Sequence, residues 1–354
     1  MAAQHGEDQF PVVDSHIHLY AAAHIPSLSW TADLAQDHPL NRQYSTNEYQ
    51  AVTQTCSNLL GFVFVETDRK SGLQETAWHD VFDEVDFLMR IARGTPRDGE
   101  GHRPEDSRLV LGVVPWAPVP AGETTLIRYV HQVQQHCGDR WDLIKGFRYL
   151  VQDKPAGVML QPQFIEGLQW LGSNGFTFDL GVDCRSGGLH QLQEACDMLD
   201  RVYNGDSHVK IIINHFCKPN LRLTASEAAS GHQDFTRWKE CIEKMASHPS
   251  TYMKLSGLFS ELPKQDEANP TAISTLVEQT RPWVNAVFKA FSPSRIMFGS
   301  DWPVCNVGGP DIEASWAHWY NVVSAILDDE GLAADQKLEV WSGTAIQAYN
   351  VQIT

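Results

Sequence analysis

The sequence lacks the features that would assign it to a membrane or to a secretory pathway. No apolar run approaches the length of a membrane span. The first ten residues, MAAQHGEDQF, have neither the basic nor the apolar region of a signal peptide. The seven cysteines include no CxxC pair, which predicts free thiols in a reducing compartment. The cytoplasm is therefore the expected location.

Positive charge is scarce as well. Lys and Arg total 27 against 44 Asp and Glu, which gives a formal net charge of −17. A nucleic-acid-binding protein needs a basic surface to neutralise phosphates, and an acidic surface repels anionic membranes. The charge therefore argues against a nucleic acid or a membrane as partner and favours a neutral small molecule. The sequence leaves a homo-oligomer open.

Eight short runs rich in apolar and β-branched residues alternate with helical stretches along the chain. Several of these runs are continuously hydrophobic, as expected for strands that are buried on both faces. Strand–helix alternation repeated eight times is typical of a parallel sheet closed into a barrel. We therefore predict an α/β fold, a distorted (β/α)8 TIM barrel. The runs are 12–19, 61–67, 109–116, 143–150, 176–182, 209–216, 251–257 and 295–302.

An open, doubly wound sheet is the alternative fold, and it usually shows a glycine-rich fingerprint after its first strand. Here the first run is followed by LYAAAHIPSLSW, which has no such fingerprint. We expect a single domain over residues 1–354. Its long connection 19–60 should cover the catalytic face, and residues 94–108 should form a solvated loop at the opposite face. Apolar residues at helical spacing predict helices over 162–172, 188–204, 234–248, 274–291 and 334–350.

Polar residues occur where the predicted strands end, which is where TIM barrels place their active sites. The first run ends with Asp14, His16 and His18, and residues two apart point to the same side of a strand. Two imidazoles at this spacing can chelate one divalent ion or hold one substrate oxygen between them. The alternative is a pair of core histidines satisfied by hydrogen bonds.

His215 and Asp301 end the sixth and eighth runs. An imidazole that closes a strand of isoleucines is costly unless a function requires it. A carboxylate at the position of Asp301 can act as a general base on water or bind a metal, whereas a helix cap or turn is its structural alternative. With His16 and His18, these residues offer up to four ligands for one divalent metal ion, zinc first among the candidates. A site without metal stays open.

Other polar and aromatic residues near the strand ends are candidates for substrate binding. An arginine inside a barrel needs a carboxylate partner or a polarised substrate carbonyl, so Arg148 is both a catalytic and a binding candidate. Asp179 and Lys254 are as consistent with a salt bridge as with catalysis, and Lys218 is a candidate to reach substrate oxygens. Aromatic faces beside polar groups suit sugar-like ligands. The predicted substrate-binding residues are Glu66, Arg148, Trp30, Trp116, Trp302 and Arg185, and the predicted catalytic residues are Asp301, His215 and Arg148.

Seven segments in a fixed order carry a family resemblance. VVDSHIHLY, GFVFVET, IKGFRYL, FDLGV, INHFCKP, MKLSGL and MFGSDWPV together resemble the amidohydrolase superfamily. More narrowly, they resemble its "amidohydrolase 2" branch of sugar-lactone hydrolases, which includes rhamnonolactone and fuconolactone hydrolases. The resemblance spans residues 12–305 and implies a distorted (β/α)8 barrel that hydrolyses a lactone.

The resemblance also implies roles for individual residues. His16, His18 and His215 match the family histidines, and Asp301 matches the aspartate at the end of strand 8. Arg148 stands where other branches carry a bridging lysine, which argues against a binuclear metal centre. The implied reaction opens L-rhamnono-lactone or a similar aldonolactone to the free acid, with Asp301 taking a proton from the attacking water. A metal-dependent decarboxylase of the same superfamily and a non-catalytic sugar-binding barrel are the alternatives.

Overall fold

The computed structural model describes residues 10–205 and 207–353. Residues 1–9 lie outside the described residues. They make up nearly all of the N-terminal stretch that the sequence predicts not to be a signal peptide. Among the described residues, no helix combines the length and the apolar character that crossing a membrane requires. All seven cysteines are free.

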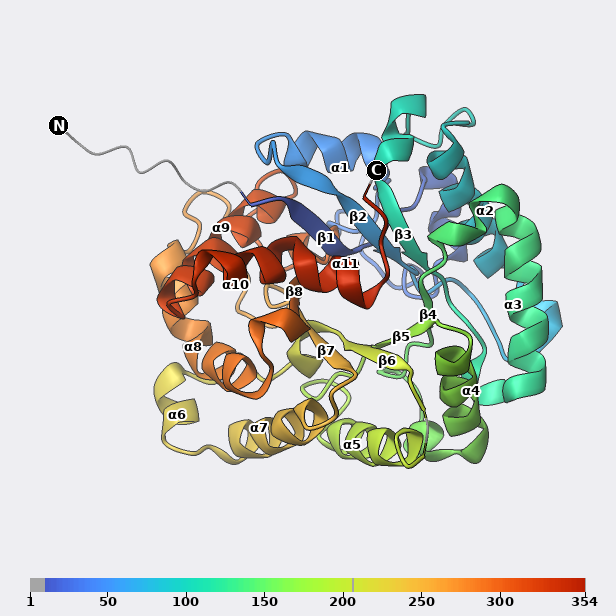
Figure 1. The fold of residues 1–354 in the computed structure, drawn as a ribbon. Helices are drawn as coiled ribbons and strands as arrows, with labels where there is room; N and C mark the ends of the chain where they lie inside the picture. Colours follow the sequence, from blue (N-terminus) through green and yellow to red (C-terminus); the bar gives the residue numbers. More distant parts are fainter. Residues whose placement is uncertain (1–9, 206, 354) are drawn as a thin grey trace.

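Parallel strands form the centre of the molecule (Figure 1). They pair in chain order as two groups, β1 to β3 and β4 to β8. Each of the eight predicted runs overlaps one of them. The strands are β1 (Val12–Ile17), β2 (Leu59–Val65), β3 (Val110–Val114), β4 (Gly146–Arg148), β5 (Thr177–Leu180), β6 (Lys210–Ile213), β7 (Thr251–Leu255) and β8 (Ile296–Phe298).

Short pairings between the two groups close the barrel. Two isolated parallel bridges join β3 to β4, and a bridge between Ile17 and Trp302 joins β1 to the end of β8. At this second seam, the Asp301 N–H donates to the His16 carbonyl at 2.9 Å, and the His18 N–H donates to the Trp302 carbonyl at 2.8 Å. The predicted distorted (β/α)8 barrel is confirmed, and its β1–β8 seam runs through four of the predicted site residues.

Helices surround the strands (Figure 1). The apolar spacing predicted α4, α5, α7 and α8 to within two residues at each end, because these helices bury one face against the barrel. The predicted helix 334–350 is divided by a π-helical turn, Glu339–Gly343. The helices are α1 (Thr46–Thr53), α2 (His79–Arg93), α3 (Glu123–Cys137), α4 (Pro162–Ser173), α5 (His190–Val202), α6 (Ala225–Ala229), α7 (Gln233–Ala246), α8 (Ile273–Ala290), α9 (Ser315–Asp329), α10 (Ala334–Leu338) and α11 (Thr344–Ala348).

The last helix covers the N-terminal end of the barrel. Ala345, Ala348 and Tyr349 pack in one apolar cluster with inward-facing side chains of β1, β2, β3, β6, β7 and β8. The Lys210 ammonium, at the start of β6, donates to the Gln347 carbonyl at 2.9 Å. With this end filled by α11, the C-terminal ends of the strands are where a ligand can enter.

The connection 94–108 is exposed along most of its length but buries three polar residues. Glu100 and His102 are buried, and Glu100 forms an ion pair with Arg90 of α2 at 2.5 Å. The buried Asp106 accepts a hydrogen bond from the Thr46 hydroxyl of α1 at 2.6 Å. The predicted solvated loop is therefore confirmed for most of these residues, while Glu100 and Asp106 serve in addition as buried partners for α2 and α1.

Candidate active site

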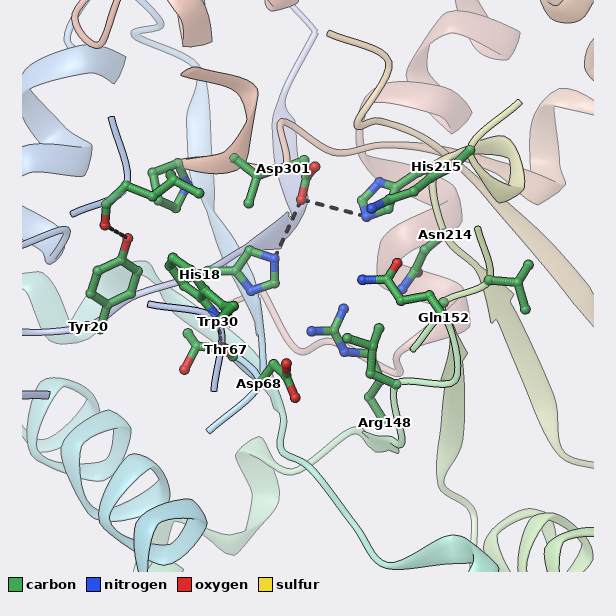
Figure 2. Close-up of a pocket in the computed structure, with 17 residues that line it drawn as sticks. His18, Tyr20, Trp30, Thr67, Asp68, Arg148, Gln152, Asn214, His215 and Asp301 are labelled. Atoms are coloured by element: carbon green, nitrogen blue, oxygen red, sulfur yellow. Dashed lines mark hydrogen bonds and ion pairs between the residues drawn. The ribbon is translucent and has the colours of Figure 1, made fainter. Parts of the chain in front are cut away.

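A cavity of about 210 Å³ opens at the C-terminal ends of the barrel strands. Its wall includes polar residues from several strand ends and also Tyr20, Trp30 and Leu40, which belong to the connection after β1. Figure 2 shows the labelled side chains around this space, with Trp30 and His18 on one side and Asn214 and His215 on the other. Residues that are far apart in the sequence therefore share one chamber.

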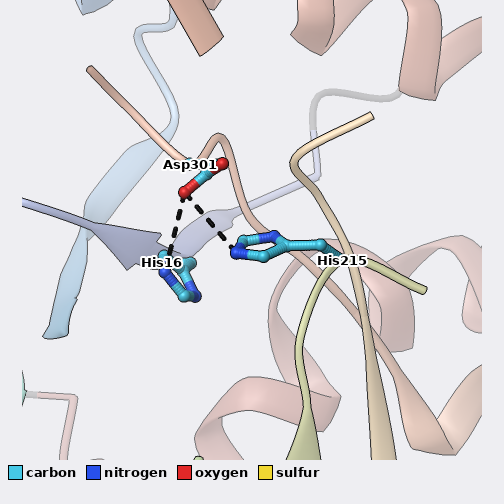
Figure 3. Close-up of side chains that lie close together, drawn as sticks. All are labelled: His16, His215 and Asp301. Carbon is cyan, nitrogen blue, oxygen red and sulfur yellow. Dashed lines mark ion pairs between the residues drawn. The ribbon is translucent and has the colours of Figure 1, made fainter. Parts of the chain in front are cut away.

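Three imidazoles converge on one carboxylate oxygen at the wall of this chamber, which His18, His215 and Asp301 line and the fully buried His16 does not. The Nε2 atoms of His16, His18 and His215 lie 3.6, 3.5 and 3.6 Å from Asp301 Oδ1, and two of these contacts appear in Figure 3. The two strand-1 histidines approach each other to 3.3 Å between their Nε2 atoms. All four residues are buried. His16, His215 and Asp301 also satisfy the spacing of a group of donors that can hold a metal ion.

A strained backbone presents two of these side chains. Residues 215–218 have φ angles of 54°, 52°, 61° and 48°, and Asp301 has φ of 58°. A left-handed conformation costs a non-glycine residue about 1–2 kcal/mol, so four in a row need support from their surroundings. Part of that support is the Trp238 indole N–H, which donates to the Phe216 carbonyl at 2.8 Å. The turn brings both His215 and Lys218 to the cavity wall.

Hydrogen bonds fix the tautomer of one imidazole. His18 Nδ1 lies 2.8 Å from the Val65 carbonyl, so it carries the ring proton and donates it. The Nε2 atom of His18 is then an unprotonated acceptor, 3.3 Å from His16 Nε2 and 3.5 Å from Asp301 Oδ1. His215 Nδ1 lies 2.8 Å from the Ser256 hydroxyl, which can either donate or accept.

Lys254 controls the proton of His16. Its Nζ lies 3.1 Å from His16 Nδ1 and 2.6 Å from the Asp179 carboxylate, which also accepts from the Tyr349 hydroxyl at 2.9 Å. An ammonium group can only donate, so a charged Lys254 leaves the His16 proton on Nε2, where it faces Asp301. Burial, and then the charge of Lys254, lowers the pKa of His16 well below its usual value.

The electrostatics favour an ionised Asp301 beside a neutral His215. Burial lowers the pKa of His215 to about 3, so this imidazole is uncharged near neutral pH. Burial alone would raise the pKa of Asp301, but the neighbouring His215 and His18 and the Lys218 ammonium bring it below its usual value. A carboxylate in this setting can accept a proton from water or bind a cation.

Arg148 has the carboxylate partner that its burial requires. Its Nε donates to Glu66 Oε1 and its Nη2 donates to the Glu66 carbonyl, both at 2.6 Å. Burial by itself would lower the pKa of Arg148, but Glu66 raises it overall, so the guanidinium stays charged. Arg148 also lines the cavity, and its Nη1 takes no part in the contacts with Glu66.

Among the residues predicted to bind substrate, Trp30 and Arg148 line the cavity. The other four do not, because each is engaged elsewhere: Glu66 is buried under Arg148, Trp116 packs on Tyr129 and Tyr149, Trp302 packs on Tyr44 and Tyr49, and Arg185 pairs with Glu261.

Other residues line the cavity without having been predicted from the sequence. Among them are Thr67, Asp68, Gln152 and Asn214. Asn214 lies immediately after β6, and Thr67 lies two residues after the end of β2. A systematic search of strand ends would therefore have found both. Gln152 and Asp68 lie further into loops, where the sequence holds no comparable signal.

The chain matches the model of the family described as amidohydrolase over residues 13–351. Among curated relatives, the L-rhamnono-gamma-lactonase of Scheffersomyces stipitis is 34% identical over 348 residues, which cover 97% of this chain and 99% of that protein. The L-fucono-1,5-lactonase of Burkholderia multivorans is 26% identical over 274 residues, which cover 75% of this chain and 76% of that protein.

A solved structure agrees with these similarities at the level of the fold. The crystal structure of an amidohydrolase from Burkholderia multivorans with bound zinc superposes with a TM-score of 0.70 at 24% identity. The alignment covers 96% of this chain and 99% of that one.

The burial of His215 predicts a loss of stability in acid. An unfolded histidine takes up a proton near its usual pKa of 6.5, whereas folded His215 stays neutral down to about pH 3. The unfolded state therefore binds more protons below pH 6.5, and this group lowers the free energy of unfolding by up to about 1.4 kcal/mol per pH unit as the pH falls. The free energy of unfolding is measured in urea for chelator-treated wild type and His215→Gln between about pH 6 and pH 4. Its slope against pH should correspond to about one fewer proton in the variant.

His131 provides the control, because it is exposed on α3. His131→Gln should keep the wild-type slope. Equal slopes for wild type and His215→Gln would contradict the neutral, buried state of His215.

Proposed function

We propose a function from the premise that this chain belongs to the amidohydrolase family, whose model matches residues 13–351. The protein is a lactonase, an enzyme that hydrolyses a sugar-acid lactone to the free acid, and L-rhamnono-lactone or a similar aldonolactone is its substrate. Within the structure, the observation that carries this function is the buried Asp301 carboxylate with three imidazoles around one of its oxygens.

Asp301 is the general base of the proposed reaction. It takes a proton from a water molecule, and the oxygen of that water attacks the carbonyl carbon of the lactone ring. The unprotonated Nε2 of His18 accepts the second hydrogen bond of the water and so orients it. The bond between the carbonyl carbon and the ring oxygen then breaks, and Asp301 returns its proton to the departing alkoxide. One water is consumed and one hydroxy acid is formed.

Arg148 and His215 stabilise the negative charge that develops on the carbonyl oxygen. Arg148 is a permanent cation at the cavity wall, and its contacts with Glu66 hold the guanidinium in place before substrate arrives. When Ser256 donates to His215 Nδ1, the ring proton lies on Nε2, on the side of Asp301, and can be donated to the same oxygen.

The residues at the centre fit one divalent ion, and zinc is the ion we propose. Asp301 Oδ1 lies 3.5 to 3.6 Å from each Nε2 atom, and the Nε2 atoms of His16 and His18 are 3.3 Å apart. The ligand atoms of His16, His215 and Asp301 all lie within 4.8 Å of one another. Ligands of a tetrahedral zinc with bonds of about 2.0–2.1 Å are separated by about 3.3–3.4 Å. His16, His18, His215 and Asp301 would hold the ion, which when bound polarises a carbonyl or lowers the pKa of a water. The zinc in the Burkholderia multivorans structure supports this choice.

His16 fits the ion under one condition. Its Nε2 can bind a metal only when it carries no proton, and a charged Lys254 at Nδ1 keeps that proton in place. Ligation by His16 therefore requires Lys254 to give up a proton. Burial lowers the pKa of Lys254, although the adjacent Asp179 carboxylate acts in the opposite direction.

Two proposals concern the chain as a whole. Residues 1–354 form a single domain in which the connection 19–60 covers the catalytic face, and the presence of Tyr20, Trp30 and Leu40 in the cavity wall supports this arrangement. The cytoplasm is the proposed location, because seven free thiols are typical of a reducing compartment.

Removal of the base should abolish most of the activity. Asp301→Asn keeps the shape of the side chain but cannot accept a proton, so we expect kcat on an aldonolactone to fall by at least about 100-fold. A pH-indicator assay on a panel of sugar lactones measures this. Asp142→Asn is the matched control, because Asp142 lies on the surface before β4 with its side chain 72% exposed. A folded Asp301→Asn protein with near-wild-type kcat would exclude Asp301 as the base, and release of CO2 in place of acid would favour a decarboxylase.

Metal content can be measured independently of mechanism. We expect about one equivalent of a divalent ion in the untreated protein, from the four-ligand set. His18→Ala should lose ion and activity together, because it removes the ligand whose Nε2 atom carries no proton. Elemental analysis with a lactone assay before and after chelation decides the point. Full activity in protein that holds well under one equivalent would remove the ion from the mechanism and leave the histidines as hydrogen-bonding groups.

A further inference from the structure

The amide of Asn214 has no hydrogen-bond partner among the described residues. Both Oδ1 and Nδ2 are unpaired, although the residue is 1% exposed. Its main chain is satisfied: the N–H donates to the Leu180 carbonyl at 3.0 Å, and the carbonyl accepts from the Cys217 N–H at 2.9 Å. The first bond extends the pairing of β5 with β6 and the second lies within the turn after β6. Together they fix the position of a side chain that makes no hydrogen bond to the described residues.

The unpaired amide belongs to the cavity wall. Other buried side-chain atoms in the described part of the chain lack partners, but none of those residues lines this cavity. Gly181, on the neighbouring strand end, also lines the cavity, and a Cβ atom added there would come within 3.9 Å of Asn214 Nδ2. An unpartnered donor and acceptor at the wall of a ligand cavity are groups that a ligand can satisfy.

The position of Asn214 relates it to one part of the substrate. It directly precedes His215, and Figure 2 places it with His215 and Gln152 on one side of the chamber, across from His18 and Trp30. A carbonyl that reacts between Asp301 and Arg148 has its neighbouring ring carbons within this space. The substituents on those carbons share it with the amide.

A carboxamide presents an acceptor and a donor side by side. Two hydroxyls on adjacent carbons match this pair, because one can donate to Oδ1 while the other accepts from Nδ2. We propose that Asn214 is a specificity-determining residue that binds the hydroxyls next to the lactone carbonyl and so restricts the enzyme to polyhydroxylated lactones. This inference rests on the lactonase function proposed above and narrows its substrate class.

Discrimination follows from the burial of the amide. A substrate without these hydroxyls leaves both amide atoms unpaired in the complex, as they are in the free protein, and gains no binding there. Sites that hydrogen-bond a substrate hydroxyl can lower kcat/KM for an analogue without it by about 10⁴- to 10⁵-fold. We expect wild-type kcat/KM on L-rhamnono-gamma-lactone to exceed that on its 2,3-dideoxy analogue, which lacks both hydroxyls, by at least about 100-fold.

The experiment compares this preference in wild type and in Asn214→Leu, which has nearly the same size but no hydrogen-bonding atoms. The kcat/KM ratio of the two lactones should fall to about 10 or below in the variant, with most of the loss on the hydroxylated substrate. Asn47→Leu is the control at an exposed asparagine and should keep the wild-type ratio. Circular dichroism and thermal unfolding check that each variant is folded.

The outcomes separate this inference from the function on which it rests. A wild-type ratio below about 10, or an unchanged ratio in folded Asn214→Leu, overturns the role of Asn214 while lactone hydrolysis stands. Because the wild-type ratio alone can overturn it, the inference does not depend on the folding of the variant. Hydrolysis of none of the lactones by wild type would overturn both.

Discussion

The negative charge of Asp301 is the constraint on which the centre of this barrel depends. A carboxylate that is 2% exposed has almost no water to stabilise it, so the protein must supply the compensating dipoles and charges. The Nε2–H of His16 and, when Ser256 donates to its Nδ1, the Nε2–H of His215 do so at 3.6 Å, with the Lys218 ammonium nearby. This arrangement requires unusual backbone at two strand ends, since Asp301 and residues 215–218 are all left-handed. The same geometry that stabilises the charge leaves it able to accept a proton.

The barrel seam provides the rigidity that this strained geometry needs. The Asp301 N–H is bonded to the His16 carbonyl across the seam, so closure of the barrel positions the carboxylate relative to the strand-1 histidines. Asp14 holds Ser300, the residue before Asp301, in place. Its carboxylate accepts hydrogen bonds from the Ser300 N–H at 2.8 Å and from the Trp316 indole N–H of α9 at 2.9 Å. Fold and site are thus coupled, because the pairing that completes the barrel also aligns the reactive groups.

The sequence predicted which residues meet but not how every side chain is oriented. Strand-end position was sufficient for His16, His18, His215 and Asp301, because parallel strands bring their ends to one face of a barrel. It was insufficient for Trp116, whose ring packs on Tyr129 and Tyr149 and does not enter the cavity. Side-chain direction and the choice of ion-pair partner depend on neighbours distant in the chain, as with Arg185 and Glu261. The left-handed turn after β6 contains no glycine, so no signal in the sequence predicts it.

The central claim is that water activated by Asp301 attacks the lactone carbonyl carbon. Hydrolysis of an aldonolactone in ¹⁸O-labelled water under single-turnover conditions, with the label located by mass spectrometry, tests it most directly. The account predicts one ¹⁸O atom in the carboxylate of the product and none in the released hydroxyl group. Label in that hydroxyl would mean attack at the alkyl carbon of the ring and would contradict the account.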